Sequence, residues 1–296
     1  MKRVAGFSLG FAAANLLVPT SAKCKAAAPV AEWIGTRYLD SAIKENIRKL
    51  KQNHPHLKIG ETHCHTTYSD GNYSVEQLMI RSASLGLDFL VITEHLIPNL
   101  YPLAHSIASI AERGRQFRDW DHDGLEPIRV YPAFEVSTEQ GHLILAFPDD
   151  YLRPERRGDI VRQFSRFDST IFPMETAARL VKPFGGISII PHPNISRAYP
   201  FGVSTDFIEK HLTGLVDAIE DISTGHGYRA SYAEDLGLSS IGSSDDHFNL
   251  IIGTTVTAYD SSLHKDLMSA VRARETFALK VDDSLDELIS AARLVL

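Results

Sequence analysis

The stretch KIGETHCHTTYSDG at residues 58–71 combines an expected β-strand with two histidines and a turn. Successive side chains of a strand point to opposite faces, so His63 and His65 project in the same direction. Asp245 and His247 repeat this spacing at the end of a later expected strand. Imidazole and carboxylate donors together suit zinc, manganese or iron better than calcium. The two pairs therefore predict a metal site.

Strand-like and helix-like stretches alternate from residue 58 onward. The expected strands are 58–64, 88–93, 129–136, 142–147, 186–191, 216–222 and 239–243. The expected helices lie near 74–85, 102–117, 157–166, 174–184, 205–213, 227–236 and 264–274. This rhythm predicts an α/β fold built from βα units. A chain of 296 residues with 44% hydrophobic content can bury one sizeable core.

The expected strands also place the candidate ligands. Each lies at or just beyond the C-terminal end of a strand. In α/β barrels this edge of the sheet carries the active site. The placement therefore supports a catalytic metal site independently of residue type.

The N-terminus has the pattern of an export signal. Two basic residues precede an apolar run over 4–18, and small residues follow it. We expect residues 1–22 to be a signal peptide, which would make the protein periplasmic or extracellular with no stable membrane anchor in the mature chain. The alternative is a helix packed on the domain of a cytoplasmic protein. Residues 23–57 are then a linker and helix, and 58–296 the catalytic domain.

Charge and cysteine content narrow the function classes. The formal net charge of −7 argues against a broad basic face for duplex nucleic acid. Two cysteines cannot form a disulfide framework, so Cys24 and Cys64 are expected to be free thiols. Cys64 lies between two histidines of one strand face, and its side chain should pack on the opposite face.

Six short motifs, each weak alone, follow one another along the chain. They are ETHCHTTYSDG at 61–71, ITEH at 92–95, FEVS at 134–137, GHLILAF at 141–147, PHP at 191–193 and SSDDH at 243–247. This ordered series, over about 58–280, resembles the PHP (polymerase and histidinol phosphatase) family, and most closely its stand-alone metal-dependent phosphoesterases. The resemblance implies a distorted (β/α)7 barrel that holds two or three divalent metal ions, of manganese, iron or zinc.

The resemblance also implies which residues hold the metals. The nine implied ligands form three groups: His63, His65, Glu135 and Asp245; Glu135 again with His142 and His192; and Asp70, His95 and His247. The implied reaction is hydrolysis of phosphoesters by a metal-bound hydroxide, with Glu135, Asp245 and His247 as catalytic residues. Small phosphorylated molecules, nucleotides or short single-stranded oligonucleotides are the expected substrates.

Two positions depart from the family pattern. Glu61 and Glu94 stand where the family usually has aspartate, which changes how a supporting carboxylate would reach its histidine. The doublet at 245 and 246 leaves two candidate ligands. Asp245 is preferred over Asp246, because it would share a strand face with His247.

Several further residues have a functional and a structural interpretation. Arg197 is the candidate for phosphate binding, since a guanidinium can hold two phosphate oxygens, and a solvated loop arginine is the alternative. His226 either lines the pocket or caps the following helix. Glu220 either supports a ligand or is a buried strand carboxylate. DWDHDG at 119–124 resembles a calcium loop, but Val130 stands where its closing carboxylate is needed, so we expect a solvated turn.

Two other functions remain open from the residues alone. An amidohydrolase-type enzyme would cleave C–N or C–O bonds with fewer metals and a bridging carbamylated lysine or glutamate. A metal-stabilised binding module would keep the ligands without turnover. A complete third group of ligands favours phosphoester hydrolysis over both.

Overall fold

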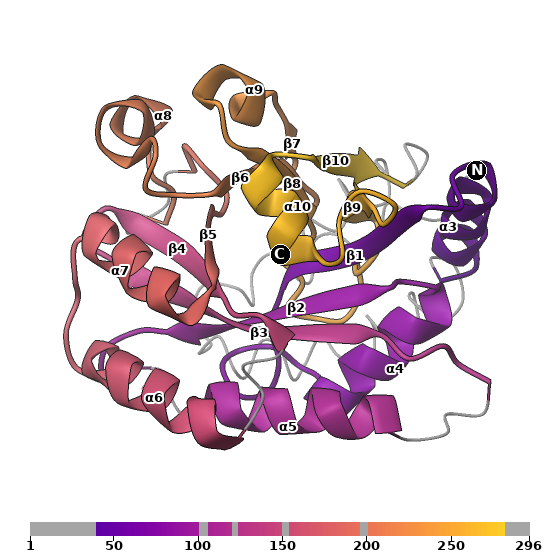
Figure 1. The fold of residues 1–296 in the computed structure, drawn as a ribbon, viewed down its shortest axis with the longest axis horizontal. Helices are drawn as coiled ribbons and strands as arrows, with labels where there is room; N and C mark the ends of the chain where they lie inside the picture. Colours follow the sequence, from indigo (N-terminus) through magenta and orange to yellow (C-terminus); the bar gives the residue numbers. More distant parts are fainter. Residues whose placement is uncertain (1–39, 101–105, 120–123, 150–153, 196–200, 282–296) are drawn as a thin grey trace, which may run out of the picture.

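In the computed structural model of the chain, the described residues are 40–100, 106–119, 124–149, 154–195 and 201–281. They form a mixed α/β fold in which a curled sheet carries helices on its outer side (Figure 1). The candidate Arg197, the segment 1–22, Cys24 and residues 120–123 of the calcium-loop candidate lie outside the described residues. Within the described residues, no helix has the length and apolar character needed to cross a membrane.

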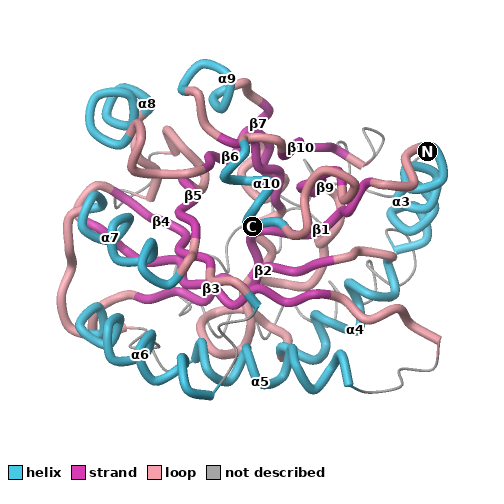
Figure 2. The backbone as a smooth tube through the Cα atoms, viewed as in Figure 1, coloured by secondary structure: helices cyan, strands magenta, loops and turns pink. Residues whose placement is uncertain are grey.

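Ten strands make up the described sheet, in the order β10-β9-β1-β2-β3-β4-β5-β6-β7, with β8 also paired to β6. Their bounds are β1 Leu57–Cys64, β2 Phe89–Leu96, β3 Arg129–Thr138, β4 Gly141–Ala146, β5 Ile187–Ile190, β6 Ala218–Ser223, β7 Tyr228–Arg229, β8 Ser239–Ser243, β9 Thr255–Asp260 and β10 Thr276–Lys280. Figure 2 shows these strands curling around a common interior.

Most of the helices lie along the outside of the sheet (Figure 1). Their bounds are α3 Asp40–Asn53, α4 Val75–Leu85, α5 Ser106–Asp119, α6 Pro154–Phe164, α7 Met174–Val181, α8 Thr205–Phe207, α9 Tyr232–Leu236 and α10 Leu267–Ala273. Short turns of other helix types continue three of them, at Ser165–Asp168, Lys182–Phe184 and Ile208–Leu212.

Local sequence explains where α4 begins and ends. Ser74 accepts a hydrogen bond from the amide of Gln77, and the Gln77 side chain accepts one from the amide of Ser74, a reciprocal cap. Gly86 ends the helix in the left-handed conformation, at φ 88°, which glycine adopts without a steric cost. The expected helix over 74–85 is therefore confirmed.

Strand direction departs from a uniform βα repetition. β1, β2 and β3 are parallel, but β4 runs antiparallel to both β3 and β5. Only two residues separate β3 from β4, which is too short for a crossover helix and makes a hairpin. β9 pairs antiparallel with β1 and β10, so the sheet is compatible with a distorted barrel and is not a regular one.

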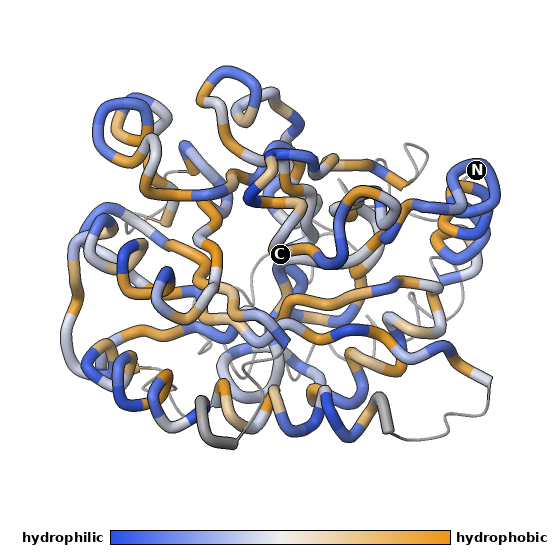
Figure 3. Tube along the Cα trace, viewed as in Figure 1, coloured by the Kyte–Doolittle hydropathy of each residue, from blue (hydrophilic) through white to orange (hydrophobic). Residues whose placement is uncertain are grey.

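The apolar strands pack on both faces, as their continuous hydrophobic runs indicate. Figure 3 shows apolar residues concentrated along the strands. On the outer side, α3 contributes Ile43 and Ile47 to one buried cluster with β1, β2 and α4, and Cys64 packs in the same cluster. The Cys64 thiol is fully buried and donates to the carbonyl of Val91 at 3.4 Å. This contact agrees with its expected packing role.

The inward-facing positions of the strands change character along their length. In β2 the residues on one face are Phe89, Val91, Thr93 and His95, and in β3 they are Tyr131, Ala133 and Glu135. The apolar members pack with Leu267 and Met268 of α10, in a cluster that fills the inside of the sheet. The ligand-type residues follow at the opposite end. The same face of β2 and β3 therefore contributes apolar residues to the core at one end and candidate ligands at the other.

Candidate metal centre

The nine candidate ligands come together at one end of the curled sheet. β1 supplies His63, β2 supplies His95 and β3 supplies Glu135, while the others lie on β4 or in the loops that follow strands. The expectation that each ligand follows the C-terminal end of its strand was wrong for His142, which is near the start of β4. Because β4 is antiparallel, its N-terminal end reaches the same edge.

The first group consists of His63, His65, Glu135 and Asp245. The Nε2 atoms of both histidines lie 3.2 Å from Asp245 Oδ1. The same two atoms lie 3.5 and 3.4 Å from Glu135 Oε2. Two imidazole nitrogens and two carboxylate oxygens thus face one small volume, as a tetrahedral transition-metal site requires.

The second group uses the other oxygen of Glu135. Glu135 Oε1 lies 2.8 Å from His142 Nδ1 and 2.9 Å from His192 Nε2. His192 follows β5 and has a left-handed backbone, at φ 32°, which is uncommon for residues other than glycine. Glu135 therefore has one oxygen in each group, the arrangement of a bridging carboxylate.

The third group lies beside the first and is the most exposed. Asp70 Oδ2 is 3.5 Å from His95 Nε2, and Asp70 Oδ1 is 3.4 Å from His247 Nε2. His65 also approaches these residues, with its ring stacked on His95 and His247. The His247 side chain is 20% exposed, against none for His63 and His65. This group forms the open side of the site.

The unpaired atoms of the first group test whether a metal would fit. His63 Nε2, His65 Nε2 and Asp245 Oδ1 are buried and form no hydrogen bond among the described residues; buried Glu135 Oε2 forms none either, although it lies 2.9 Å from Nδ1 of His95. Buried polar atoms are almost always hydrogen-bonded, since an unsatisfied one costs about 1–3 kcal/mol. The ligand atoms of His63, His65 and Glu135 lie within 4.8 Å of one another, and so do those of His63, His192 and Asp245, which is close enough to hold a divalent cation.

Burial and neighbouring charges shift the pKa values of this cluster. Burial raises the pKa of Glu135, but the surrounding His142, His95 and His63 outweigh burial and hold that pKa well below its usual range. Burial and two neighbouring histidines lower the pKa of His65 to about 3. Ionised Glu135 and neutral His65 are in the forms that bind metal. Burial lowers the pKa of His63, but Asp245 and Glu135 outweigh burial and raise it, so a metal would have to displace a proton there.

Glu220 supports the first group from behind. Its Oε1 accepts from Nδ1 of His63 at 2.8 Å and from the Ser243 hydroxyl at 2.7 Å. Its Oε2 accepts the amide of His192 at 2.7 Å. With its proton on Nδ1, His63 presents a lone pair on Nε2 toward the site. Of the two interpretations that the sequence left open for Glu220, the contacts favour support of a ligand.

The two glutamates that depart from the family pattern bind backbone amides. Glu61 Oε1 accepts from the amides of Thr62, His63 and Ser244, at 3.0, 3.1 and 3.0 Å. Glu94 accepts from the amides of Thr66 and Ser69, at 3.0 and 2.9 Å. The described contacts therefore correct the expectation that these carboxylates reach a histidine ring.

The choice between the two adjacent aspartates follows from their surroundings. Asp246 accepts from the backbone amides of Phe248, Ile251 and Ile252, and so holds the loop. Asp245 points its Oδ1 toward His63 and His65 of the first group. The expectation that Asp245 and His247 share a strand face was nevertheless wrong, because β8 ends at Ser243 and Asp245 has a left-handed backbone, at φ 51°. The turn after β8 therefore sets the direction of the Asp245 carboxylate.

Two predictions lie largely beyond the described residues. Arg197 falls in 196–200, so its place relative to the site is not described. In the calcium-loop candidate, Val130 is buried in the core at 2% exposure, where it contributes no ligand oxygen.

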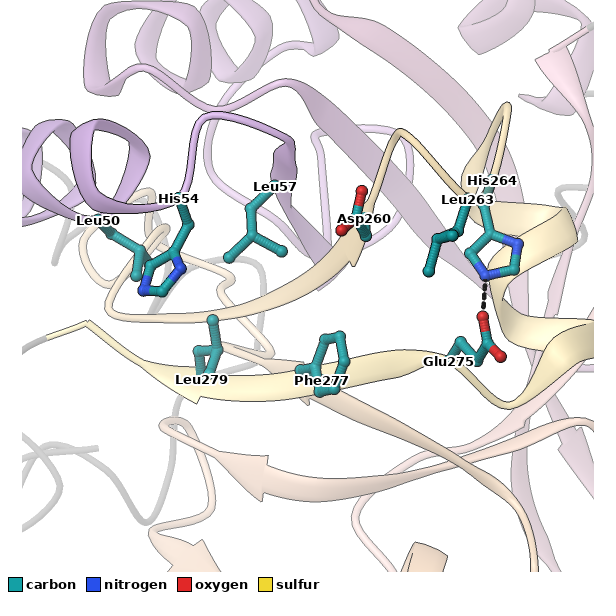
Figure 4. A pocket seen from close by; sticks show the side chains of 9 residues that line it. All are labelled: Leu50, His54, Leu57, Asp260, Leu263, His264, Glu275, Phe277 and Leu279. Carbon is teal, nitrogen blue, oxygen red and sulfur yellow. Dashed lines mark hydrogen bonds and ion pairs between the residues drawn. The ribbon is translucent and has the colours of Figure 1, made fainter.

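A separate hollow lies away from the ligand cluster (Figure 4). Its lining is mainly apolar: Leu50, His54, Leu57, Asp260, Leu263, His264, Glu275, Phe277 and Leu279. His264 and Glu275 form an ion pair with each other at its edge. None of the nine candidate ligands contributes to it, so this hollow is not the candidate metal centre.

Comparison with known proteins finds likeness in structure and not in sequence. No family model matches the chain, and no curated protein matches it. A two-domain protein from Bacteroides vulgatus ATCC 8482, which contains a predicted PHP-like metal-dependent phosphoesterase, is similar with a TM-score of 0.51 and 19% identity, over 76% of this chain and 65% of that one. PsfC from Pseudomonas syringae PB-5123 is similar with a TM-score of 0.53 and 16% identity, over 80% of this chain and 97% of that one.

At such low identity these likenesses show a shared fold alone. The chain spans about 65% of the two-domain protein from Bacteroides vulgatus. An amidohydrolase from Chromobacterium violaceum is similar only at a TM-score of 0.42, with 17% identity over 76% of this chain and 98% of that one. The chain therefore has a fold found in a protein with a PHP-like domain, and a His/Asp/Glu cluster that could bind metal.

Proposed function

We propose that the protein is a metal-dependent phosphoesterase of the PHP family, with a distorted (β/α)7 barrel. The observation that carries the proposal is the convergence of four buried ligand atoms without hydrogen-bond partners, with a second and a third group of ligands around them. The fold shared with a protein that contains a PHP-like domain supports it. Fold alone would not, because one fold hosts many activities.

In this proposal the three groups hold two or three divalent ions of manganese, iron or zinc. The proposed ligands are His63, His65, Glu135 and Asp245 in the first group; Glu135, His142 and His192 in the second; and Asp70, His95 and His247 in the third. The ligand atoms of the third group lie within 4.8 Å of one another and of His65. Divalent ions bound there would polarise phosphate oxygens and lower the pKa of a bound water, the chemistry that phosphoester hydrolysis needs.

The chain's own residues orient and seclude this centre. Glu135 lies between two groups and fixes their spacing through its two oxygens. Glu220 holds the proton of His63 on Nδ1. The deep members of the cluster exclude water, and His247 at the open side is the ligand that an incoming phosphate would meet first. Among the three proposed catalytic residues, Glu135 and Asp245 lie deeper than His247.

The proposed substrates are small phosphorylated molecules, nucleotides or short single-stranded oligonucleotides. The formal net charge of −7 disfavours duplex nucleic acid as a partner. An export signal at 1–22 is part of the proposal and would place the reaction outside the cytoplasm.

Arg197 is proposed to bind the substrate phosphate. Arg197→Ala should raise KM for the best phosphoester by about 10- to 100-fold, the value of a charge-assisted hydrogen bond, and change kcat less. Steady-state kinetics measures both constants. Arg162→Ala is the matched control, because Arg162 is exposed on α6 and pairs with Asp159. A KM equal to that of the unaltered protein would contradict the assignment.

Amidohydrolase-type hydrolysis of C–N or C–O bonds is the alternative activity, and a non-catalytic metal-stabilised module is the other alternative. The third group, Asp70 with His95 and His247, favours phosphoester hydrolysis over both, since a two-metal amidohydrolase has no need of it.

Metal content and phosphate release together test the proposal. Metal is measured by mass spectrometry on the purified protein, and phosphate release is followed over phosphomonoesters, nucleotides and short oligonucleotides. Two or three equivalents of transition metal with metal-dependent release are expected. Metal binding without release from any of these, together with cleavage of an amide or carboxylic ester, would overturn the phosphoesterase in favour of the alternative.

A further inference from the structure

The turn between β6 and β7 brings a tenth residue to the metal centre. His226 lies in this turn, which closes through a hydrogen bond from the amide of Gly227 to the carbonyl of Ser223 at 2.7 Å. Nε2 of His226 lies 2.7 Å from Asp245 Oδ2. The α9 helix begins later, after Ser231. His226 therefore contacts a ligand, and it does not cap the following helix.

The backbone attaches this turn to the segment that carries Asp245. The amide of Thr224 donates to the carbonyl of Ser243 at 3.1 Å, and that of Gly225 to the carbonyl of Ser244 at 2.8 Å. A Cβ at residue 225 would lie 2.4 Å from the Ser244 oxygen, closer than any side chain allows. Glycine at 225 thus permits the approach that sets His226 against Asp245.

The two oxygens of Asp245 have different surroundings. Oδ1 lies 3.2 Å from the Nε2 atoms of His63 and His65, within the first group. Oδ2 is held by His226. The left-handed backbone of Asp245 is sparsely populated for residues other than glycine and persists only where its surroundings hold it. The contact with His226 is one such constraint.

We propose that His226 is a positioning residue for Asp245, fixing its carboxylate so that Oδ1 alone faces the first metal position. The inference rests on the metal centre of the proposed function. A carboxylate with a free Oδ2 can rotate or turn both oxygens toward a cation, whereas a donor on Oδ2 selects one orientation. Partners of this kind commonly change metal affinity by about 10- to 100-fold when they are removed.

Two substitutions separate positioning from packing. His226→Phe keeps a ring beside His192, whose centroid lies 4.7 Å away, but removes the donor. His226→Gln keeps an N–H near the position of Nε2. His54→Phe repeats the ring substitution at an exposed position outside the cluster and serves as the control.

The measurement is Mn²⁺ and Zn²⁺ affinity of the full chain, by competition with a chelator after removal of metal. Visible spectra of the Co²⁺-loaded proteins report the coordination of the tightest site. His226→Phe should weaken one class of site by about 10- to 100-fold and alter the Co²⁺ spectrum, while His226→Gln should remain within about threefold of the unaltered protein. The thermal stability of metal-free His226→Gln should match that of the unaltered protein, while that of His226→Phe should be lower, because Asp245 Oδ2 loses its donor.

The outcomes separate this inference from the proposed function. If His226→Phe binds metal as tightly as the unaltered protein, with the same Co²⁺ spectrum, the inference is overturned while phosphoester hydrolysis stands. If His226→Phe is weakened and His226→Gln is not, the inference holds even where no phosphoester is cleaved. Absence of metal binding by the unaltered protein would overturn both.

Discussion

Glu135 is the residue on which the proposed centre depends most, because its two oxygens serve two groups. Glu135→Gln keeps the shape of the side chain and removes its charge. We expect loss of metal and a fall in phosphoesterase activity of more than about 100-fold, since a shared ligand should matter more than a supporting residue. Metal analysis and kinetics on one preparation check this. Glu45→Gln is the control, because the Glu45 side chain on α3 is 45% exposed. Full metal content with normal turnover in Glu135→Gln would contradict the bridging role.

Glu220 makes a second prediction at this scale. It accepts hydrogen bonds from His63, His192 and Ser243, and all three donors are buried. Glu220→Leu should lower the free energy of unfolding of the metal-free protein by about 1–3 kcal/mol or more, because buried donors lose their acceptor. Metal affinity should also fall by about 10- to 100-fold. Urea unfolding and chelator competition measure the two effects, and a change in neither would exclude this supporting role.

The candidate site could be predicted in part from single residues. Histidines at 63 and 65 and the acidic doublet at 245 are visible because chelating residues lie two apart or in short motifs. The sequence offered Glu220 and His226 as candidates for supporting roles but did not show which ligand each of them contacts. Glu220 contacts His63 across 157 positions, and His226 contacts Asp245 across 19, and neither spacing is encoded by a local period.

At the scale of elements, the loop between β1 and α4 carries Asp70 and depends on Gly71. A Cβ at residue 71 would lie 2.3 Å from the His65 carbonyl oxygen. Gly71→Ala should therefore displace the loop, destabilise the protein by about 1–3 kcal/mol and weaken the third metal site selectively. Gly158→Ala in α6 is the control, since nothing lies within 4 Å of the added Cβ, and there alanine should stabilise the helix by about 0.5–1 kcal/mol. Equal metal stoichiometry in Gly71→Ala and the unaltered protein would refute the selective effect.

Some of the confirmed strands, such as β2 and β4, contain four consecutive apolar residues, whereas the missed strands β9 and β10 do not. FLVIT in β2 is apolar on both faces and is recognisable alone. β9, TVTAYD, contains buried threonines instead: Thr257 is fully buried and donates to the carbonyl of Gly242 at 2.9 Å. Such polar core residues hide a strand, because only the neighbouring strand shows that their hydroxyls are satisfied. β10 was missed because its side chains are mostly half-buried.

At the scale of the whole molecule, the candidate ligands come from parts of the chain that are far apart in sequence. An isolated bridge joins Cys64 to Asp246, which brings the end of β1 beside the loop after β8. His63 of β1 then lies 3.5 Å from Glu135 of β3 and 3.2 Å from Asp245 of that loop. An unfolded chain does not hold these atoms together, so metal should bind the folded state and stabilise it.

Removal of metal should therefore lower Tm as well as activity. At a free metal concentration of about 100 times Kd, one bound ion stabilises the folded state by about 2.7 kcal/mol. For a domain of this size each kcal/mol corresponds to about 2–4 °C, so a chelator should lower Tm by about 5–10 °C per ion. Glu135→Gln should show a much smaller chelator effect, because it has already lost the shared ligand. Calorimetry of both proteins with and without metal is the measurement. If the unaltered protein has the same Tm in saturating metal and in chelator, metal binding by this cluster does not stabilise the folded state.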